Sequence, residues 1–124
     1  MTTIERNSFI ELARTKVASY LLLNVDKNYI HFNDCLTFDF KNKSYDEFFE
    51  FSKNHKNKLI VIENITDLSS VDLNKMIEFT NHIESSLIII HNDTSKNIPS
   101  SLLKKLFIFD NIYMEDKNKH KARF

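Results

Sequence analysis

The chain has 124 residues, an apolar fraction of 42% and 17 basic against 17 acidic residues, which fits one globular domain with its own core over residues 1–124. Glycine is absent, and this excludes a phosphate-binding loop and a dinucleotide fingerprint, because both need glycines where the backbone approaches phosphate. The zero net charge argues against nucleic acid as the partner, since binding to phosphates needs a basic excess.

Apolar periodicity predicts helices that alternate with strands. In chain order, the predicted elements are an N-terminal helix over 1–18, strands over 19–25 and 29–32, a short strand or helix start over 36–40, a helix over 44–54, a strand over 59–62, a helix over 72–82, a strand over 87–90, a helix that begins near Pro99, an edge strand within 108–114 and a frayed basic tail over 117–124.

Polar residues at the predicted helix starts have the spacing of N-terminal caps. Ser8 with Glu11, and Ser44 with Glu47, have capping-box spacing. Asp72 is the expected N-cap of the helix over 72–82. The inner stripe of this helix is expected to contain Leu73, Met76, Ile77, Thr80 and Ile83.

The order of elements predicts an α/β fold. The wholly apolar runs 59–62 and 87–90 indicate strands buried on both faces, and strands that alternate with helices indicate right-handed parallel crossovers. The polar residues 26–28 can form a tight turn, which favours a hairpin between the first two strands. We therefore expect a small mixed sheet of about four to five strands with an N-terminal hairpin, parallel core strands, helices packed on them and an extra N-terminal helix. Without glycine, turns with positive φ are expected at Asn or Asp.

Cysteine usage and hydropathy indicate the compartment. The single cysteine, Cys35, excludes an intramolecular disulfide and a cysteine-based zinc site, and it fits a reducing environment. No basic and apolar leader opens the chain, and no apolar run approaches the length of a membrane span. We expect a cytoplasmic protein without membrane insertion.

The sequence holds no clear catalytic or metal-binding pattern. None of the five histidines has a partner at i+3 or i+4, so we expect neither a metal nor a cofactor. Glu63, Asp67 and Asp72 cluster near the end of a buried strand, and His91 lies at the next strand end, where α/β proteins bind ligands. They leave a small enzyme that uses Glu63, Asp67 and His91 as one alternative, but we favour the interpretation that Asp72 caps a helix while Glu63 and Asp67 are loop charges. We predict that the protein is not an enzyme.

Three stretches carry a resemblance to a known family. They are SYLLLNVDKNYIHFNDCLTFDF, KLIVIENITDLSSVDLNKMIEF and LIIIHNDTSKNIPSSLLKKLFIFDNIYM. From Tyr20 onwards the chain resembles the STAS family, which includes anti-sigma-factor antagonists, anion-transporter tails and a cytoplasmic subunit of bacterial lipid-transport ABC systems. The LTF of the first stretch is similar to the lipid-transport branch. The resemblance implies a STAS-like core over 19–116 and a regulatory role through protein–protein contacts, with an ABC transporter ATPase subunit or a regulatory kinase as partner and a homodimer left open.

The resemblance also implies a partner-binding surface over residues 64–76. The residues expected to form it are Ser69, Ser70, Asp72, Leu73, Asn74 and Met76. In the family a hydroxyl after the aspartate is often the phosphorylated switch, and Leu73 stands at that position here. The usual switch is therefore lost, while Ser69 and Ser70 stay as candidate phospho-acceptors at a helix start. An exposed Leu73 would serve as the apolar anchor.

The second stretch, followed by LIIIHND and IPSSLLKK, is also similar to the Walker-B-to-sensor part of an AAA+ clamp-loader subunit. This resemblance implies a replication accessory or inhibitor protein without ATPase activity. Residues 20–40 hold no phosphate loop, the turn over 26–28 is too short for a crossover helix, and Lys104 and Lys105 stand where such subunits carry arginine. The order and direction of the strands distinguish the two resemblances, because a hairpin in a mixed sheet favours the STAS family and an all-parallel core favours the AAA+ class.

Overall fold

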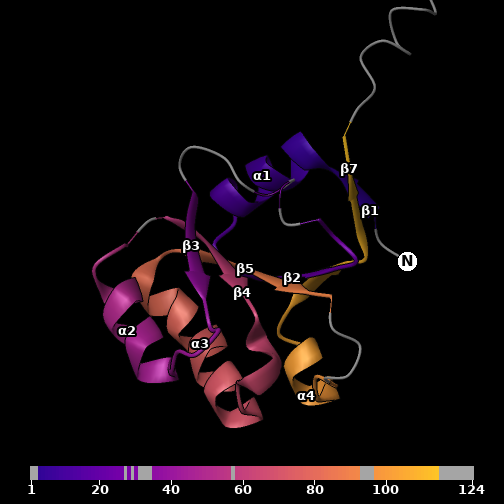
Figure 1. Ribbon diagram of the computed structural model, residues 1–124. Coiled ribbons are helices and arrows are strands. Elements are labelled where there is room, and N and C mark those ends of the chain that lie inside the picture. The colour runs from indigo at the N-terminus through magenta and orange to yellow at the C-terminus, as the bar shows by residue number, and fades with distance from the viewer. Residues whose placement is uncertain are drawn as a thin grey trace, which may run out of the picture.

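A computed structural model describes residues 3–26, 28, 30, 35–56, 58–92 and 97–114 (Figure 1). Its elements are β1 (Thr3–Glu5), α1 (Arg6–Thr15), β2 (Ser19–Leu23), β3 (Cys35–Asp39), α2 (Tyr45–Lys53), β4 (Leu59–Glu63), the 3₁₀ helix η2 (Ile65–Asp67), α3 (Ser70–Ile83), β5 (Ser86–His91), α4 (Ser100–Leu103), β6 (Phe107–Phe109) and β7 (Asn111–Tyr113). Five strands form a sheet in the order β3-β4-β5-β2-β6, and β1 pairs with β7 in a second, two-stranded sheet.

The predicted α/β fold with parallel core strands is confirmed. The buried strands β4 and β5 and the helices α2 and α3 lie where the periodicity placed them, with ends that shift by at most two residues. Of the segment 36–40, residues 36–39 lie in a strand, β3, rather than at a helix start. The predicted last strand is divided into β6 and β7, and β1 precedes a first helix that is shorter than expected.

The predicted N-terminal hairpin is wrong. β2 pairs with β5 along its whole length and with β6 through Tyr20–Leu22, and both pairings are parallel. Both edges of β2 are therefore occupied, and none is left for the expected strand over 29–32, of which the structure describes only Ile30. A turn-like sequence after β2 tells where the strand ends but not which strand pairs with it. Every strand pair among the described residues is parallel.

Side chains alternate between the two faces of the sheet and pack into two separate cores, one on each face, as expected for strands buried on both sides. In Figure 1, α1 lies on one side of the sheet and α2, α3 and α4 lie on the other. The core beneath α2–α4 contains Leu21, Ile60, Ile62, Leu87 and Ile89 of the sheet with Phe48, Leu73, Met76 and Leu102 of the helices. The core beneath α1 contains Tyr20, Leu22, Val61, Ile88 and Ile90 of the sheet with Phe9 and Ala13 of α1.

The N-terminal caps of α2 and α3 test the caps that the sequence predicts. The Ser44 Oγ accepts a hydrogen bond from the Glu47 N–H at 3.4 Å, which confirms the predicted cap of α2. The cap of α3 is Ser69, whose Oγ accepts from the Asp72 N–H at 3.1 Å. The prediction of Asp72 as the cap is therefore wrong. Asp72 lies in the first turn, where its negative charge interacts favourably with the positive end of the helix dipole.

The first helix begins earlier than its serine suggests. Glu5 is the N-cap of α1, and its Oε2 accepts from the Ser8 N–H at 3.0 Å, so Ser8 does not cap the helix. Hydrogen bonds from the backbone N–H groups of Asn7 and Ser8 lower the pKa of the Glu5 carboxyl. A glutamate at the N-cap is less common than a serine, and this explains why the signal pointed to the wrong residue.

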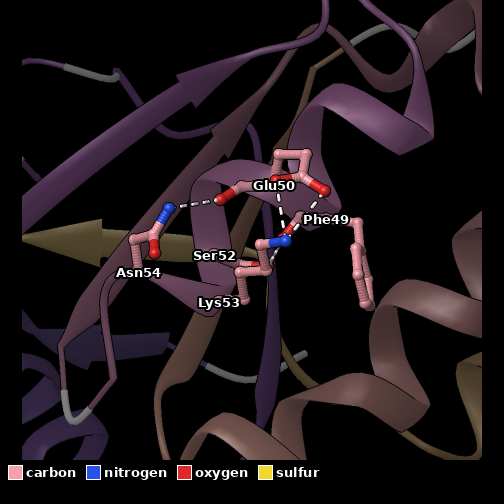
Figure 2. Close-up of polar contacts among 5 residues, drawn as sticks. All are labelled: Phe49, Glu50, Ser52, Lys53 and Asn54. Atoms are coloured by element: carbon pink, nitrogen blue, oxygen red, sulfur yellow. Dashed lines mark hydrogen bonds and ion pairs between the residues drawn. The ribbon is translucent and has the colours of Figure 1, made fainter.

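Side chains also close the end of α2 (Figure 2). The Asn54 Nδ2 donates to the Glu50 carbonyl at 3.1 Å, and the Ser52 Oγ donates to the Phe49 carbonyl at 3.2 Å. The Lys53 Nζ lies 2.9 Å from the Glu50 Oε1, which places a cation in the last turn. The Glu50 carbonyl, one of the last four of the helix, which have no intrahelical partner, is thus satisfied without a glycine cap.

Left-handed backbone occurs where the chain turns sharply. The described residues with positive φ are Asn24, Asn42, Asn64 and Glu84, with φ of 54°, 61°, 59° and 54°. The expectation that asparagine replaces glycine at such turns is confirmed at three of them. Glu84, which ends α3, is the exception, and a glutamate there costs roughly 1–2 kcal/mol in backbone strain.

Candidate functional site

A pocket of about 440 Å³ opens at the carboxyl ends of β2, β4 and β5. Its walls are formed by Asp26, Glu63, Asn64, Ile65, Thr66, Ile90, His91 and Asn92. This edge of a parallel sheet is where α/β proteins bind ligands. The pocket unites Glu63 with His91, as the sequence led us to expect, whereas Asp67 and Asp72 are not among the residues that form its walls.

A left-handed turn positions the wall that follows β4. Asn64 adopts φ 59° and ψ 53°, and its Nδ2 donates to the Asp39 Oδ1 at 2.7 Å. The same oxygen accepts from the Lys41 N–H at 2.8 Å. Asp39 and Glu63 are register partners at the ends of β3 and β4. The turn after β4 is therefore fastened to the end of β3, so this wall of the pocket is fixed by side-chain contacts.

The opposite wall is held by Asn92, directly after β5. Its Nδ2 donates to the Val25 carbonyl at 2.8 Å, and its Oδ1 accepts from the Val25 N–H at 3.1 Å. Both polar atoms of the amide thus bind backbone. Asn92 links the end of β5 to the segment after β2, and its role in this structure is to position that segment beside the pocket.

Chemistry that needs a metal cluster or an activated thiol finds no support in the described part of the chain. No group of three or more His, Cys, Asp or Glu residues there could hold a metal ion. Burial raises the pKa of the Cys35 thiol from 9.0 to about 11, and a thiol that stays protonated is a poor nucleophile. His31, Asp93 and His120 lie outside the described residues.

A second hollow, of about 380 Å³, lies between the starts of α3 and α4, and we call it the α3–α4 groove. It is lined by Ser70, Val71, Asn74, Pro99, Ser101, Leu102 and Lys105. The Lys105 Nζ donates to the Asn74 Oδ1 at 2.8 Å and lies 3.4 Å from the Glu78 Oε1. These contacts tie the end of α4 to α3 and keep the two walls of the groove together.

The predicted partner-binding residues separate into a surface set and a buried set. Ser70 and Asn74 line the α3–α4 groove, and Ser69 is exposed beside them, while Asp72 is half-buried. Leu73 and Met76 are 0% exposed and pack in the core beneath α3. The expectation of an exposed Leu73 anchor is therefore wrong, because the apolar stripe of α3 turns that side chain toward the sheet.

The exposed apolar residue at this helix start is Val71, with 65% of its surface accessible. Sequence reasoning did not single it out. The helical periodicity did contain the signal, because a residue two positions before Leu73 lies about 200° away around a helix of 3.6 residues per turn. Val71 therefore points away from the sheet when Leu73 points toward it.

No known protein family matches this chain, and no curated protein matches it either. Within the residues that the structure describes, each helix is too short or too polar to cross a lipid bilayer. On the part of the chain that the structure describes, the pocket and the α3–α4 groove are hollows from which a function can be argued.

Proposed function

We propose that this protein is a non-enzymatic interaction domain that binds a protein partner through the α3–α4 groove. The observation that carries the proposal is Val71, a valine that is 65% exposed and lines a hollow together with Pro99 and Leu102. Single exposed apolar residues are common on protein surfaces. One that lines a hollow with apolar neighbours and polar groups around it has the arrangement of an interface anchor.

The lining of the groove indicates what the partner presents. An aliphatic or aromatic side chain would lie between Val71 and Pro99, where apolar surface is removed from water. The hydroxyls of Ser70 and Ser101 can bind polar groups around that side chain. Lys105 supplies a positive charge, and its bonds to α3 hold it in one position. The partner segment therefore combines an apolar anchor with hydrogen-bond acceptors.

The groove also changes the roles of the two candidate phospho-acceptors. The Ser69 Oγ caps α3 through the Asp72 N–H, so a phosphate on Ser69 would replace an existing helix cap. Ser70 lines the groove itself. A phosphate on Ser70 would add negative charge at a helix start, where the dipole favours it, and would lie on the surface offered to the partner. Ser70 is the acceptor through which phosphorylation would regulate binding.

The parallel sheet favours the AAA+-like form of this proposal over the STAS-like form. All described strand pairs are parallel. The strands within the two similar runs, β4 and β5, end at Glu63 and His91, and both residues line the same pocket. On the STAS-like form the partner is a transporter ATPase subunit or a regulatory kinase. On the AAA+-like form the protein is a replication accessory or inhibitor without ATPase activity, and its partner is a clamp-loader or helicase component.

The test is affinity capture with the tagged full-length chain from the cells that encode it. Wild type, Val71→Asp and Val17→Asp are compared, because Val17 is a second exposed valine, 43% accessible, that lies two residues after the end of α1. Any captured protein is then purified and its affinity for the three chains is measured. We expect Val71→Asp to weaken binding at least about tenfold, from loss of one apolar contact, and Val17→Asp to bind as wild type. Equal affinities for all three chains would sink the proposal.

A further inference from the structure

We propose that the outer edge of β3 is the interface of a symmetric dimer, in which β3 pairs antiparallel with β3 of a second copy of this chain. In the sheet order β3-β4-β5-β2-β6, β3 is an end strand and has one neighbour, β4. The strand shares no residue with the α3–α4 groove. The inference therefore does not rest on the proposed function, and either can fail while the other holds.

One hydrogen bond fixes which backbone groups of β3 face β4. The Phe40 N–H donates to the Glu63 carbonyl at 3.0 Å. Backbone groups of successive residues in a strand point to opposite edges, so Leu36 and Phe38 also face β4. Thr37, the exposed central residue of β3, turns its N–H and C=O toward the outer edge. The strand therefore offers a donor and an acceptor to a further strand.

The residues of β3 lack the features that protect edge strands from pairing. Such strands are usually very short, bulged, or marked by lysine or proline. β3 has five residues in regular register with β4, and neither lysine nor proline is among them. Its one charged residue, Asp39, lies at the end, where its Oδ1 accepts from the Asn64 amide and the Lys41 N–H. The opposite end strand, β6, has only three residues.

A two-fold axis through Thr37 gives the residues of β3 suitable partners in a second β3. Leu36 then lies opposite Phe38 of the second copy, and Thr37 lies opposite Thr37, and both are favourable cross-strand pairs. Asp39 lies opposite Cys35 rather than opposite a second carboxylate. The chain has zero formal net charge, so two copies do not repel each other through a large charge of one sign. This self-complementarity favours a second copy as the occupant, in a closed dimer.

Half-buried apolar side chains beside this edge would be covered in the dimer. Leu36 is half-buried. Phe51 of α2 is half-buried too, with its ring centroid 5.3 Å from that of Phe38 and 4.8 Å from that of His55. Opposed residues of antiparallel strands share one face of a sheet, so both copies of α2 lie on the same face, next to each other across the axis. Burial of these side chains adds to hydrogen bonds that are weak by themselves.

The test is sedimentation velocity of the full chain up to millimolar concentration, with two substitutions at one position. Thr37→Pro removes the outward N–H without removing a bond to β4, and edge strands tolerate proline. Thr37→Ala, the matched control, keeps this N–H. We expect wild type and Thr37→Ala to form dimers and Thr37→Pro to raise the dissociation constant at least about tenfold, through loss of two hydrogen bonds. A monomeric wild type, unchanged dimerisation of Thr37→Pro, or an equal loss in Thr37→Ala would overturn the inference.

Disulfide formation tests the position of the axis without a proline variant. Cys35→Ser combined with Thr37→Cys leaves each copy one thiol, at the axis. Opposed residues of a hydrogen-bonded pair have Cα atoms about 5.5 Å apart, within the range of about 4.4–6.8 Å that a disulfide spans. The control combines Cys35→Ser with Thr15→Cys, at an exposed threonine that ends α1. We expect oxidised glutathione to link the Thr37→Cys chains at least about tenfold faster than the control, and equal rates would overturn the inference.

Discussion

The side chain of Asn92 binds the backbone of Val25 through both its donor and its acceptor, at 2.8 and 3.1 Å. The two bonds join the end of β5 to the segment that leaves β2, although the residues are 67 positions apart. The side-chain amide of Asn92 thus replaces the pair of backbone hydrogen bonds that a neighbouring strand would make with Val25. The wall of the pocket therefore depends on one amide.

Asn92→Ala should lower the free energy of unfolding by about 2 kcal/mol, because it removes two hydrogen bonds worth about 1 kcal/mol each. Urea unfolding followed by circular dichroism measures the change. Asn54→Ala is the matched control, since it removes one exposed bond to the Glu50 carbonyl and should cost no more than about 0.5 kcal/mol. A loss no larger than that of the control would show that the link to Val25 carries no stability.

Glu84→Gly should raise the free energy of unfolding by about 0.5–1 kcal/mol. Glu84 ends α3 with φ 54°, and glycine adopts this left-handed conformation without the strain that a side chain brings. Glu11→Gly in the exposed part of α1 is the control and should lower stability by about 1 kcal/mol. Thermal unfolding of the two variants checks the signs. A lower stability for Glu84→Gly would mean that its side chain contributes more than its backbone costs.

Tyr20→Phe should lower the free energy of unfolding by about 1 kcal/mol. The Tyr20 O–H donates to the Lys16 carbonyl at 2.6 Å and so closes the end of α1. The substitution keeps the ring, which packs edge-on against Phe9 with centroids 5.6 Å apart. Tyr45→Phe on α2 is the control and should change stability by less than about 0.5 kcal/mol. Chemical unfolding measures the free energy of unfolding of both variants. Equal losses of stability in Tyr20→Phe and Tyr45→Phe would contradict a stabilising role for the hydrogen bond from Tyr20 to the Lys16 carbonyl.

Cys35 should react slowly with iodoacetamide near neutral pH. Burial raises the pKa of its thiol from 9.0 to about 11, so the reactive thiolate is about 100-fold scarcer than in an unfolded chain. The rate should increase as the pH approaches 11. Because the unfolded thiol ionises first, stability should fall as the pH rises above 9. Mass spectrometry of folded and urea-unfolded chain measures the ratio of rates, and equal rates at pH 8 would contradict it.

The sequence contains enough to predict the elements of this fold but not their pairing. Leu59–Ile62 and Leu87–Ile90 are apolar at every position, and only a strand covered on both faces tolerates that. The partners of β2 are set by contacts far along the chain, with β5 and β6, and a turn signal at 26–28 holds no information about them. The short strands β1 and β7 have three residues each, too few for a periodicity to appear.

Part of the candidate site can be predicted from the sequence, because strand ends can be predicted while the pairing of the strands cannot. Glu63 and His91 could be placed together because the carboxyl ends of parallel strands share one edge of a sheet. Asp26 joins them only because β2 lies beside β5 rather than in a hairpin. At the other surface, helical spacing places Leu73 in the inner stripe of α3, and the 0% exposure of its side chain confirms this position and excludes an exposed anchor.

Whether a partner docks in the α3–α4 groove is tested most directly by photo-crosslinking in the cells that encode the protein. The crosslinking residue benzoylphenylalanine is placed at Val71, and in a parallel strain at Val17. A covalent product with one protein should form at Val71, and it should be lost when Ser101→Arg fills the opposite wall of the groove. Crosslinks that form equally at Val17, or that persist in the Ser101→Arg chain, would contradict an interaction surface in this groove.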